Sequence, residues 1–147
     1  MEEYIMTIDE GTTSARAVLF NKDSEIIAIC AKEFAQYYPQ PGWVEQDPKE
    51  IWLTTKEVIN RVVLQAGIDP RQIKAAGITN QRETVVVYDK NTGEPVYNAI
   101  GWADRRTAPY CDELKAAGKE QMFIDKTGLL IDGYFSGTEI KWILDNV

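Results

Sequence analysis

Histidine is absent from the 147 residues of this chain. Without an imidazole the chain can hold neither a Ser-His-Asp triad nor a histidine-ligated zinc site, so we expect any acid or base that it supplies to be a carboxylate. The two cysteines, Cys30 and Cys111, lack the paired spacing of a zinc site and are too few for a disulfide scaffold. We therefore predict two buried free thiols.

Positive charge is also scarce. Sixteen lysines and arginines stand against 23 aspartates and glutamates, and the net charge of -7 disfavours nonspecific binding to nucleic acids or acidic membranes. No stretch approaches the roughly 18 apolar residues of a membrane span, and the first residues lack the basic region of a signal peptide. These absences predict a cytoplasmic protein with no nucleic-acid and no membrane partner.

Apolar residues are frequent enough for a core. A chain of 147 residues that is 44% hydrophobic is expected to form one domain and to bury roughly 70% of its unfolded surface. Three short apolar stretches separated by turns open the chain and predict three antiparallel strands. These strands are Tyr4–Ile8, Ala17–Phe20 and Ile26–Ala31.

The polar run from Thr7 to Ser14 joins the first two predicted strands. Its glycine offers backbone freedom, and the hydroxyl and N–H groups that follow can converge on one point, as in a turn that cradles an anion. The pattern predicts a phosphate site, and the alternative is an ordinary hairpin with a polar turn. The cradle residues are Gly11, Thr12, Thr13 and Ser14.

Two charged residues flank this turn. Asp9, at the end of the first strand, is a hard oxygen ligand of the kind that holds Mg²⁺ together with phosphate oxygens. Arg16 can add charge-assisted hydrogen bonds to a phosphate. We predict a metal ligand at Asp9 and a phosphate contact at Arg16.

A loop and a long helix follow. Gln36–Pro48 contains three prolines, which predicts a loop anchored on the core by Trp43 and Val44. Asp47 is the expected N-cap of a helix over Lys49–Gln65, with Pro48 at the first helical position, Glu50 completing a capping box and Gly67 stopping the helix. The expected core stripe consists of Ile51, Trp52, Thr55, Val58, Ile59, Val62 and Val63.

A further strand, Ile73–Thr79, precedes a predicted hairpin of Thr84–Tyr88 with Pro95–Ile100. Between them lies a dense polar segment, at a strand end where α/β proteins often build ligand sites. Arg82 and Glu83 can meet one ligand only if strand alternation breaks, so we predict a bend there. The alternative is a solvated salt-bridge pair.

The last third is predicted to be helical. A helix opens at Trp102–Arg106 and ends near Gly118, a shorter one spans Lys119–Lys126, and a loop spans Thr127–Tyr134. A capping box of Ser136 with Glu139 is expected to start the last helix. The spacing of Gly128 and Gly133 matches a P-loop, but the following residues, Tyr134 and Phe135, are not the required Lys and Ser/Thr, so we predict no P-loop.

Five stretches together carry a resemblance to a known family. The chain closely resembles the N-terminal part of the glycerol kinases, a group within the FGGY carbohydrate kinases, along essentially all of its length. The stretches are Asp9–Ser14 with Arg16, Pro41–Glu45 with Asp47 and Pro48, Gly77–Thr84, Tyr97–Ile100 with Trp102 and Arg105–Thr107, and Tyr134–Thr138 with Lys141 and Trp142.

The resemblance implies an α/β fold of the actin and hexokinase type. The order strand, strand, strand, helix, strand is that of its ribonuclease H-like half, with a mixed sheet in which Ile73–Thr79 runs parallel to the first strand. Because members of the family are several times longer, residues 1–147 are expected to be part of the N-terminal domain, without the second domain that grips adenosine.

The resemblance also implies roles for particular residues. The first turn, with Arg16, would hold the phosphates of ATP, and Asp9 would bind Mg²⁺ through water. The contacts to glycerol would come from a set that can donate, accept and offer an aromatic face, and that suits a short polyol. This set is Arg82, Glu83, Trp102 and Tyr134.

The expected activity is phosphorylation of glycerol by the full-length protein, as a cytoplasmic homo-oligomer. The general base, an Asp, would lie outside this chain, so the chain alone is expected to be inactive. The alternatives are another FGGY sugar or polyol kinase and a stand-alone binding module. Glu10, where the family usually has Gln, is expected to add negative charge beside the phosphates, and Gly101 and Gly133 also depart from the family's pattern.

Overall fold

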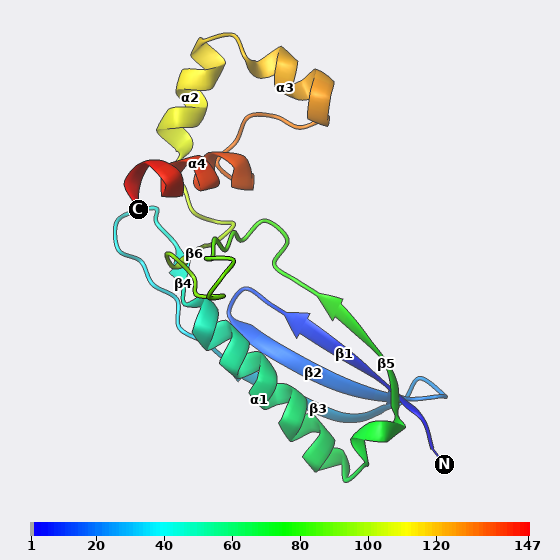
Figure 1. The fold of residues 1–147 in the computed structure, drawn as a ribbon. Helices are drawn as coiled ribbons and strands as arrows, with labels where there is room; N and C mark the ends of the chain where they lie inside the picture. The colour runs from blue at the N-terminus through cyan, green and yellow to red at the C-terminus, as the bar shows by residue number, and fades with distance from the viewer. Residues whose placement is uncertain (1) are drawn as a thin grey trace. The chain divides into compact units, whose positions relative to one another are not determined.

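The structure is a computed structural model that describes residues 2–147 (Figure 1). The chain divides into two compact units, where its length suggested one domain. Unit 1 holds the residues up to Ala35 together with Asp47–Gln81, and unit 2 holds Gln36–Gln46 together with Arg82–Val147. Each unit has its own hydrophobic core.

Unit 1 is a four-stranded mixed sheet with one long helix. The strand order is β3-β2-β1-β5, with β1, β2 and β3 antiparallel and β5 parallel to β1, as the sequence predicted. A parallel neighbour requires a crossover, and α1 (Pro48–Ala66) with the short 3-10 helix η1 (Pro70–Gln72) provides it. The strands are β1 (Tyr4–Glu10), β2 (Ser14–Asn21), β3 (Ile26–Glu33) and β5 (Ile73–Thr79).

Alternate residues of the strands build the core of unit 1 against α1. Tyr4, Met6 and Ile8 of β1 are buried because successive strand residues point to opposite faces, and these three face the helix. Val58 and Val62 of α1 are fully buried against them. Burial of each of these valines stabilises the unit by roughly 1.5–3 kcal/mol.

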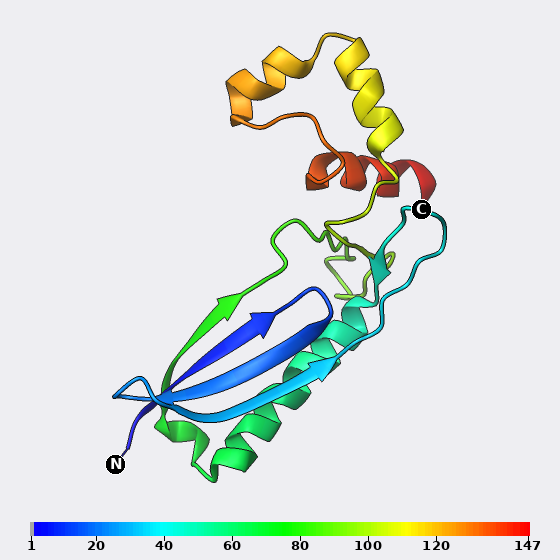
Figure 2. The same cartoon turned by 180° about the vertical axis from the view of Figure 1, so that it is seen from behind.

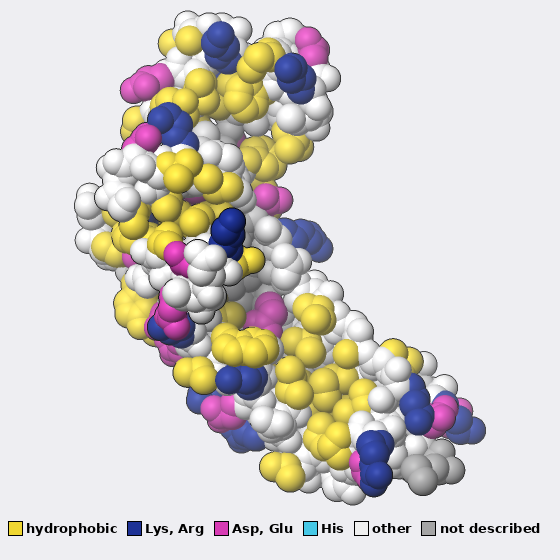
Figure 3. All heavy atoms as spheres, viewed as in Figure 1, with side chains coloured by type: hydrophobic (Ala, Val, Ile, Leu, Met, Phe, Trp, Pro, Cys, Tyr) yellow, Lys and Arg dark blue, Asp and Glu magenta, His cyan; other side chains and the backbone are white. Residues whose placement is uncertain are grey.

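The opposite face of the sheet carries no helix in unit 1, as Figure 2 shows from behind. Ile5, Ile27 and Ile29 lie on that face and are between 40% and 51% exposed. On the helix side, hydrophobic side chains also gather in a groove between α1 and β5 (Figure 3). The groove is lined by Met6, Ile59, Asn60, Val63, Leu64, Pro70 and Ile73.

The ends of α1 follow the sequence closely. Asp47 caps the helix by accepting the N–H of Lys49 at 2.8 Å, and Gly67 ends it with a φ of 65°. The predicted capping box is wrong, because Glu50 accepts the N–H of Ala35 instead. Trp52 is also not part of the core stripe, since it is 60% exposed.

Unit 2 contains a two-stranded sheet that the sequence did not predict. β4 (Glu45–Gln46), within the expected loop, pairs antiparallel with β6 (Ala99–Ile100). The predicted hairpin is reduced to two isolated antiparallel bridges, Val85 with Ile100 and Tyr88 with Pro95. Strands of two residues are too short to show an alternating pattern, which explains why β4 was missed.

Three helices complete unit 2: α2 (Ala108–Ala116), α3 (Glu120–Thr127) and α4 (Ser136–Asn146). The predicted opening of a helix at Trp102–Arg106 is wrong. The side chain of Asp104 accepts the N–H groups of Val44 and Arg106, which holds this segment in a non-helical turn until Thr107.

The predicted capping box at the start of α4 is also wrong. Phe135 occupies the N-cap position without a side-chain cap. Ser136 instead donates its hydroxyl to the carbonyl oxygen of Glu83 at 3.2 Å. Glu139 points into the interior and is fully buried.

Two expectations about the whole chain can be compared with the structure. Cys30 and Cys111 are buried and free, as predicted. Among residues 2–147, no helix combines the length and the apolar character needed to cross a membrane.

Candidate functional site

The turn between β1 and β2 is the predicted anion cradle in unit 1. The N–H of Gly11 donates to the carbonyl of Ser14 at 2.9 Å, which closes the turn around Thr12 and Thr13. Both threonines are exposed, whereas Ser14 already belongs to β2. The tip of this hairpin therefore presents two hydroxyl-bearing side chains to the surroundings.

Gly11 is required by space and not by an unusual backbone angle. Its φ lies outside the left-handed region, so the expected backbone freedom is not used. A Cβ atom at this position would lie 3.1 Å from the carbonyl oxygen of Ser14, which is tight. The N–H of Gly11 is engaged inside the turn and does not point to an anion, so the predicted anion site depends on Thr12, Thr13 and Ser14.

Asp9 and Arg16 lie opposite each other across β1 and β2. The Nη2 atom of Arg16 is 3.9 Å from Oδ2 of Asp9, which is longer than a hydrogen bond, and the side chains are 51% and 41% exposed. Such a loose, exposed pair contributes little to stability. Both groups are therefore accessible to a phosphate or a cation.

Glu10 points to the other face of the sheet. One carboxylate oxygen accepts the hydroxyl of Thr55 on α1 at 2.8 Å, and the other is buried without a hydrogen-bond partner among residues 2–147. Burial raises the pKa of Glu10, the hydrogen bond from Thr55 lowers it, and the charge of Asp9 raises it, with a net increase. The carboxyl of Glu10 thus contacts α1 and not the turn.

Arg82 and Glu83 form the predicted bend at the start of the second part of unit 2. Arg82 has a φ of 47°, in the left-handed region that a residue other than glycine rarely adopts, and both residues lie in a turn. This turn breaks the alternation of an extended chain, as the sequence predicted. Arg82 is exposed and Glu83 is half-buried.

Trp102 and Tyr134 are in contact in the same unit. Their ring centres are 6.2 Å apart at an angle of 72°, an edge-to-face arrangement, and the residues are 39% and 37% exposed. The N–H of Trp102 donates to the hydroxyl of Thr84, directly after Glu83, at 3.2 Å. The bond from Ser136 to Glu83 brings in the segment that carries Tyr134. Glu83, Trp102 and Tyr134 therefore lie on three segments of unit 2 that are joined by these contacts, and Arg82 immediately precedes Glu83 in the chain.

A buried arginine, Arg106, lies close in sequence to Trp102 and makes several contacts inside unit 2. The guanidinium of Arg106 lies 3.9 Å from the ring centre of Trp43 and 4.6 Å from that of Trp142. It forms ion pairs with Glu45 at 2.8 Å and with Asp104 at 2.9 Å. These contacts fix the segment that leads from Trp102 into α2.

Glu45 stays ionised in this interior. Burial raises the pKa of its carboxyl, but hydrogen bonds from Tyr97, Asn98 and Arg106 lower it more, so the net pKa is below the usual range. Glu45 is therefore a structural partner of Arg106.

The glycine before Trp102 has a spatial reason. The N–H of Gly101 donates to the carbonyl of Val44 at 2.9 Å, and a Cβ atom at Gly101 would lie 3.2 Å from Cγ1 of Val44. Gly133 is similarly crowded, since its Cβ would lie 3.0 Å from Oγ1 of Thr107. Both departures from the family's pattern thus occupy positions with little room for a side chain.

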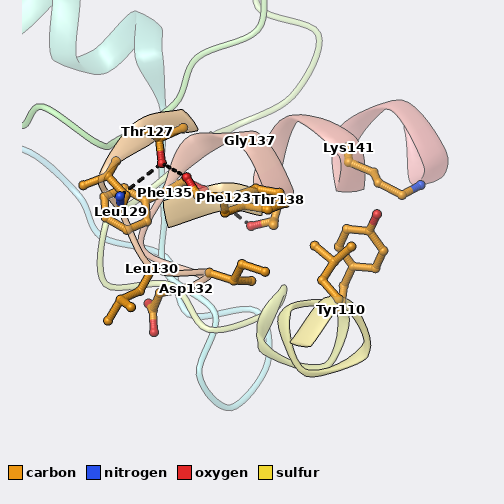
Figure 4. Close-up of a pocket in the computed structure, with 12 residues that line it drawn as sticks. Tyr110, Phe123, Thr127, Leu129, Leu130, Asp132, Phe135, Gly137, Thr138 and Lys141 are labelled. Atoms are coloured by element: carbon orange, nitrogen blue, oxygen red, sulfur yellow. Dashed lines mark hydrogen bonds between the residues drawn. The ribbon is translucent and has the colours of Figure 1, made fainter. Parts of the chain in front are cut away.

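Unit 2 also contains a cavity of about 340 Å³ between its helices (Figure 4). Tyr110 of α2, Phe123 of α3 and Thr138 of α4 line it, together with the loop that carries Leu130. Its walls are mostly apolar, and none of the four predicted glycerol residues lines it. It is therefore separate from the predicted substrate cluster.

Sequence reasoning missed three residues that position the cluster: Asp104, Arg106 and Ser136. Asp104 and Arg106 were assigned to the opening of a helix, Arg106 also to the resemblance, and Ser136 to a helix cap. Their long-range hydrogen bonds join residues that are 53 to 61 positions apart, and no sequence spacing predicts such contacts.

Comparisons with known proteins agree with these observations. The family model of the FGGY carbohydrate kinases, N-terminal domain, matches residues 4–147. The glycerol kinase of Chromobacterium violaceum is 60% identical over 146 residues, and that of Geobacillus kaustophilus is 58% identical over 147 residues. These alignments cover 99% and 100% of this chain but only 29% and 30% of the relatives.

Solved structures show the same fold. The crystal structure of Plasmodium falciparum glycerol kinase with ADP superposes with a TM-score of 0.90 at 31% identity, covering 99% of this chain and 29% of that one. Gluconate kinase from Lactobacillus acidophilus superposes with a TM-score of 0.89 at 25% identity, again over 99% and 29% of the two chains. The likeness confirms the expected actin- and hexokinase-type fold. This chain spans about 30% of the length of its relatives. The chain belongs to the FGGY family of carbohydrate kinases, since the model of that family's N-terminal domain matches residues 4–147.

Proposed function

We propose that the full-length protein is a glycerol kinase, which transfers the γ-phosphoryl group of ATP to a hydroxyl of glycerol. The observation that carries the proposal is the contact between Trp102 and Tyr134 in unit 2, together with the hydrogen bonds that tie their segments to the turn of Arg82 and Glu83. The names of relatives that are about 60% identical to this chain support it.

The side chains of this cluster suit a small triol. The guanidinium of Arg82 donates hydrogen bonds to hydroxyl oxygens, the carboxylate of Glu83 accepts hydroxyl protons, and the phenol of Tyr134 can do either. Trp102 offers an apolar ring to the carbon chain. Glycerol held between such groups has its hydroxyls oriented, which is the main contribution that a kinase makes to phosphoryl transfer.

Unit 1 would bind the nucleotide. The donor groups fit a phosphate chain, because the turn at Thr12 and Thr13 is exposed and is flanked by the accessible guanidinium of Arg16. Gly11 leaves little space for a side chain, so it keeps the turn narrow. The carboxylate of Asp9 suits Mg²⁺, which would neutralise charge on the phosphates when bound. Residues 2–147 contain no group of three or more metal-binding side chains, so the remaining ligands would be phosphate and water oxygens.

Other parts of the proposal concern the full-length protein. The general base is expected outside this chain, and its loss typically costs on the order of 10² to 10⁴ in rate. Residues 1–147 alone are therefore expected to show no turnover of glycerol. Assembly as a homo-oligomer in the cytoplasm also belongs to the proposal.

The test is a substrate comparison with the full-length protein. ADP release with ATP and Mg²⁺ should be much faster with glycerol than with xylulose or gluconate, because the cluster fits a short polyol. A preference for xylulose or gluconate would instead assign the protein to another branch of the FGGY kinases. Binding of glycerol without ADP release by the full-length protein would favour the binding-module alternative.

A further inference from the structure

Glu139 is a buried acid that the proposed function does not use. The residue is fully buried in the first turn of α4, and neither of its carboxylate oxygens has a hydrogen-bond partner among residues 2–147. A buried carboxylate without hydrogen bonds is costly, whereas the protonated acid is tolerated far better. The position therefore favours a neutral carboxyl.

The charged groups around Glu139 come from two other segments. Asp104 and Arg106 precede α2, and Glu83 lies in the turn that carries the proposed substrate contact. The net pKa of Glu139 is raised to about 8: burial is the largest cause, the charges of Asp104 and Glu83 also raise it, and that of Arg106 lowers it. Arg106 offers limited compensation, because its guanidinium is already paired with Glu45 and Asp104.

The first turn of α4 is attached to the proposed glycerol cluster at two points. Ser136, three residues before Glu139, donates its hydroxyl to the carbonyl of Glu83. Tyr134 immediately precedes the N-cap residue Phe135, and the two rings are in edge contact at 5.2 Å. Glu139 in this turn and Ile143 further along α4 are both buried, and Ile143 packs with Val85 and Ile100. These contacts hold the start of α4 in place. A shift of this turn would move Glu83 and Tyr134 together.

We propose that Glu139 is a positioning residue of the glycerol site. Its neutral carboxyl holds the first turn of α4 in place next to Glu83, and its ionisation displaces that turn and weakens glycerol binding. The inference rests on the proposed function. The proton released by Glu139 goes to solvent, and no other group changes its covalent state. The structure thus links proton binding at Glu139 to substrate binding at Glu83 and Tyr134.

The linkage predicts a definite pH dependence. If glycerol binds only when Glu139 is protonated and its pKa is about 8, the apparent Kd should rise about tenfold between about pH 7 and about pH 9. By reciprocity, glycerol binding at about pH 8.5 should take up most of one proton. A residue that only fills space would give neither effect.

The experiment is calorimetric titration of the full-length protein with glycerol, across this pH range and in two buffers of different ionisation enthalpy. Wild type should show the tenfold weakening and the proton uptake. Glu139→Gln should bind glycerol equally at both pH values without proton uptake, because its amide is neutral throughout. Asp145→Asn, which removes an exposed carboxylate paired with Lys141 on the same helix, should behave like wild type.

The outcomes separate the two proposals. Failure of the wild type to bind glycerol at any pH overturns the proposed function itself. Binding that is independent of pH and takes up no proton, or a pH dependence that persists in Glu139→Gln, overturns the role of Glu139 while the kinase assignment stands. If Glu139→Gln fails to fold, the proton uptake of the wild type still decides the question.

Discussion

The guanidinium of Arg106 lies 3.9 Å from the ring centre of Trp43 while it forms ion pairs with Glu45 and Asp104. The side chains of the three charged residues are between 0% and 3% exposed. One buried cation therefore joins β4 to the segment that presents Trp102. Two carboxylates depend on it for their compensation, so the cluster is sensitive to loss of this single residue.

Arg106→Ala should destabilise the protein by about 3–5 kcal/mol, because it leaves Glu45 and Asp104 as buried charges without their partner. Arg106→Lys should cost less but still be measurable, since an ammonium cannot reproduce the planar fork between two rings. Urea unfolding measures both. Arg105→Ala is the matched control, because Arg105 is 55% exposed in its pair with Asp132 and should cost less than about 1 kcal/mol. Equal costs for the two alanine variants would refute the argument.

Gly11→Ala should weaken nucleotide binding in the full-length protein. The new Cβ would lie 3.1 Å from the carbonyl of Ser14, so the turn must open by a few tenths of an ångström at the proposed phosphate cradle. We expect a loss of about tenfold in ATP affinity, the equivalent of roughly 1.4 kcal/mol, measured by titration with a non-hydrolysable ATP analogue. Gly77→Ala in β5, where a Cβ meets nothing within 4 Å, should leave affinity unchanged.

Trp102→Ala should weaken glycerol binding on the order of tenfold, because the apolar ring that contacts Tyr134 is lost from the proposed cluster. Trp52→Ala removes a tryptophan of α1 that is 60% exposed and should leave glycerol affinity as in wild type. Calorimetry on the full-length protein checks both. Similar losses in the two variants would mean that a general structural effect, and not contact with glycerol, explains the result.

Stability should fall as pH rises through neutrality. Burial holds the pKa of Glu139 at about 8, above the ordinary value of 4.5, so the folded state keeps a proton that the unfolded state has lost between these values. Stability is therefore greatest below pH 4.5 as far as this group is concerned, declines up to about pH 8 and then levels off.

Urea unfolding at about pH 6 and about pH 9 should show this decline as a few kcal/mol in wild type and little change in Glu139→Gln. Glu45 acts in the opposite sense, because its lowered pKa stabilises the folded state at neutral pH and this contribution is lost only in acid. It should therefore not contribute between these two pH values. A wild type that is equally stable at both would show that Glu139 is not protonated in the folded state.

Unit 1 could be predicted from the sequence almost completely. Its strands are short apolar stretches bounded by turns, and α1 has a capping Asp47 and a terminating Gly67, which are local signals that act over a few residues. The bend at Arg82 was also predictable, since two adjacent polar residues could share a ligand only outside a regular strand.

Unit 2 was predicted less well because long-range contacts override its local signals. The pattern of Ser136 and Glu139 matches a capping box, yet Ser136 bonds to Glu83 and Glu139 is buried. The helix expected at Trp102 is prevented by the hydrogen bonds that Asp104 accepts from Val44 and Arg106. Ser136 and Asp104 are each satisfied by a partner distant in sequence, whereas Glu139 is buried without a hydrogen-bond partner among residues 2–147.

The sequence by itself determined the strands and the long helix of unit 1 and the residue types available for phosphate and polyol chemistry, because periodicity, capping and composition are properties of neighbouring residues. The parallel place of β5 beside β1 followed from the family resemblance. Only the tertiary structure decided that Trp102 and Tyr134 touch, that Arg106 is buried between rings and carboxylates, and that Glu139 is a buried acid without a hydrogen-bond partner in the described part of the chain. Burial and pairing depend on segments that are far apart along the chain, and the free energy that selects them comes from packing the whole unit.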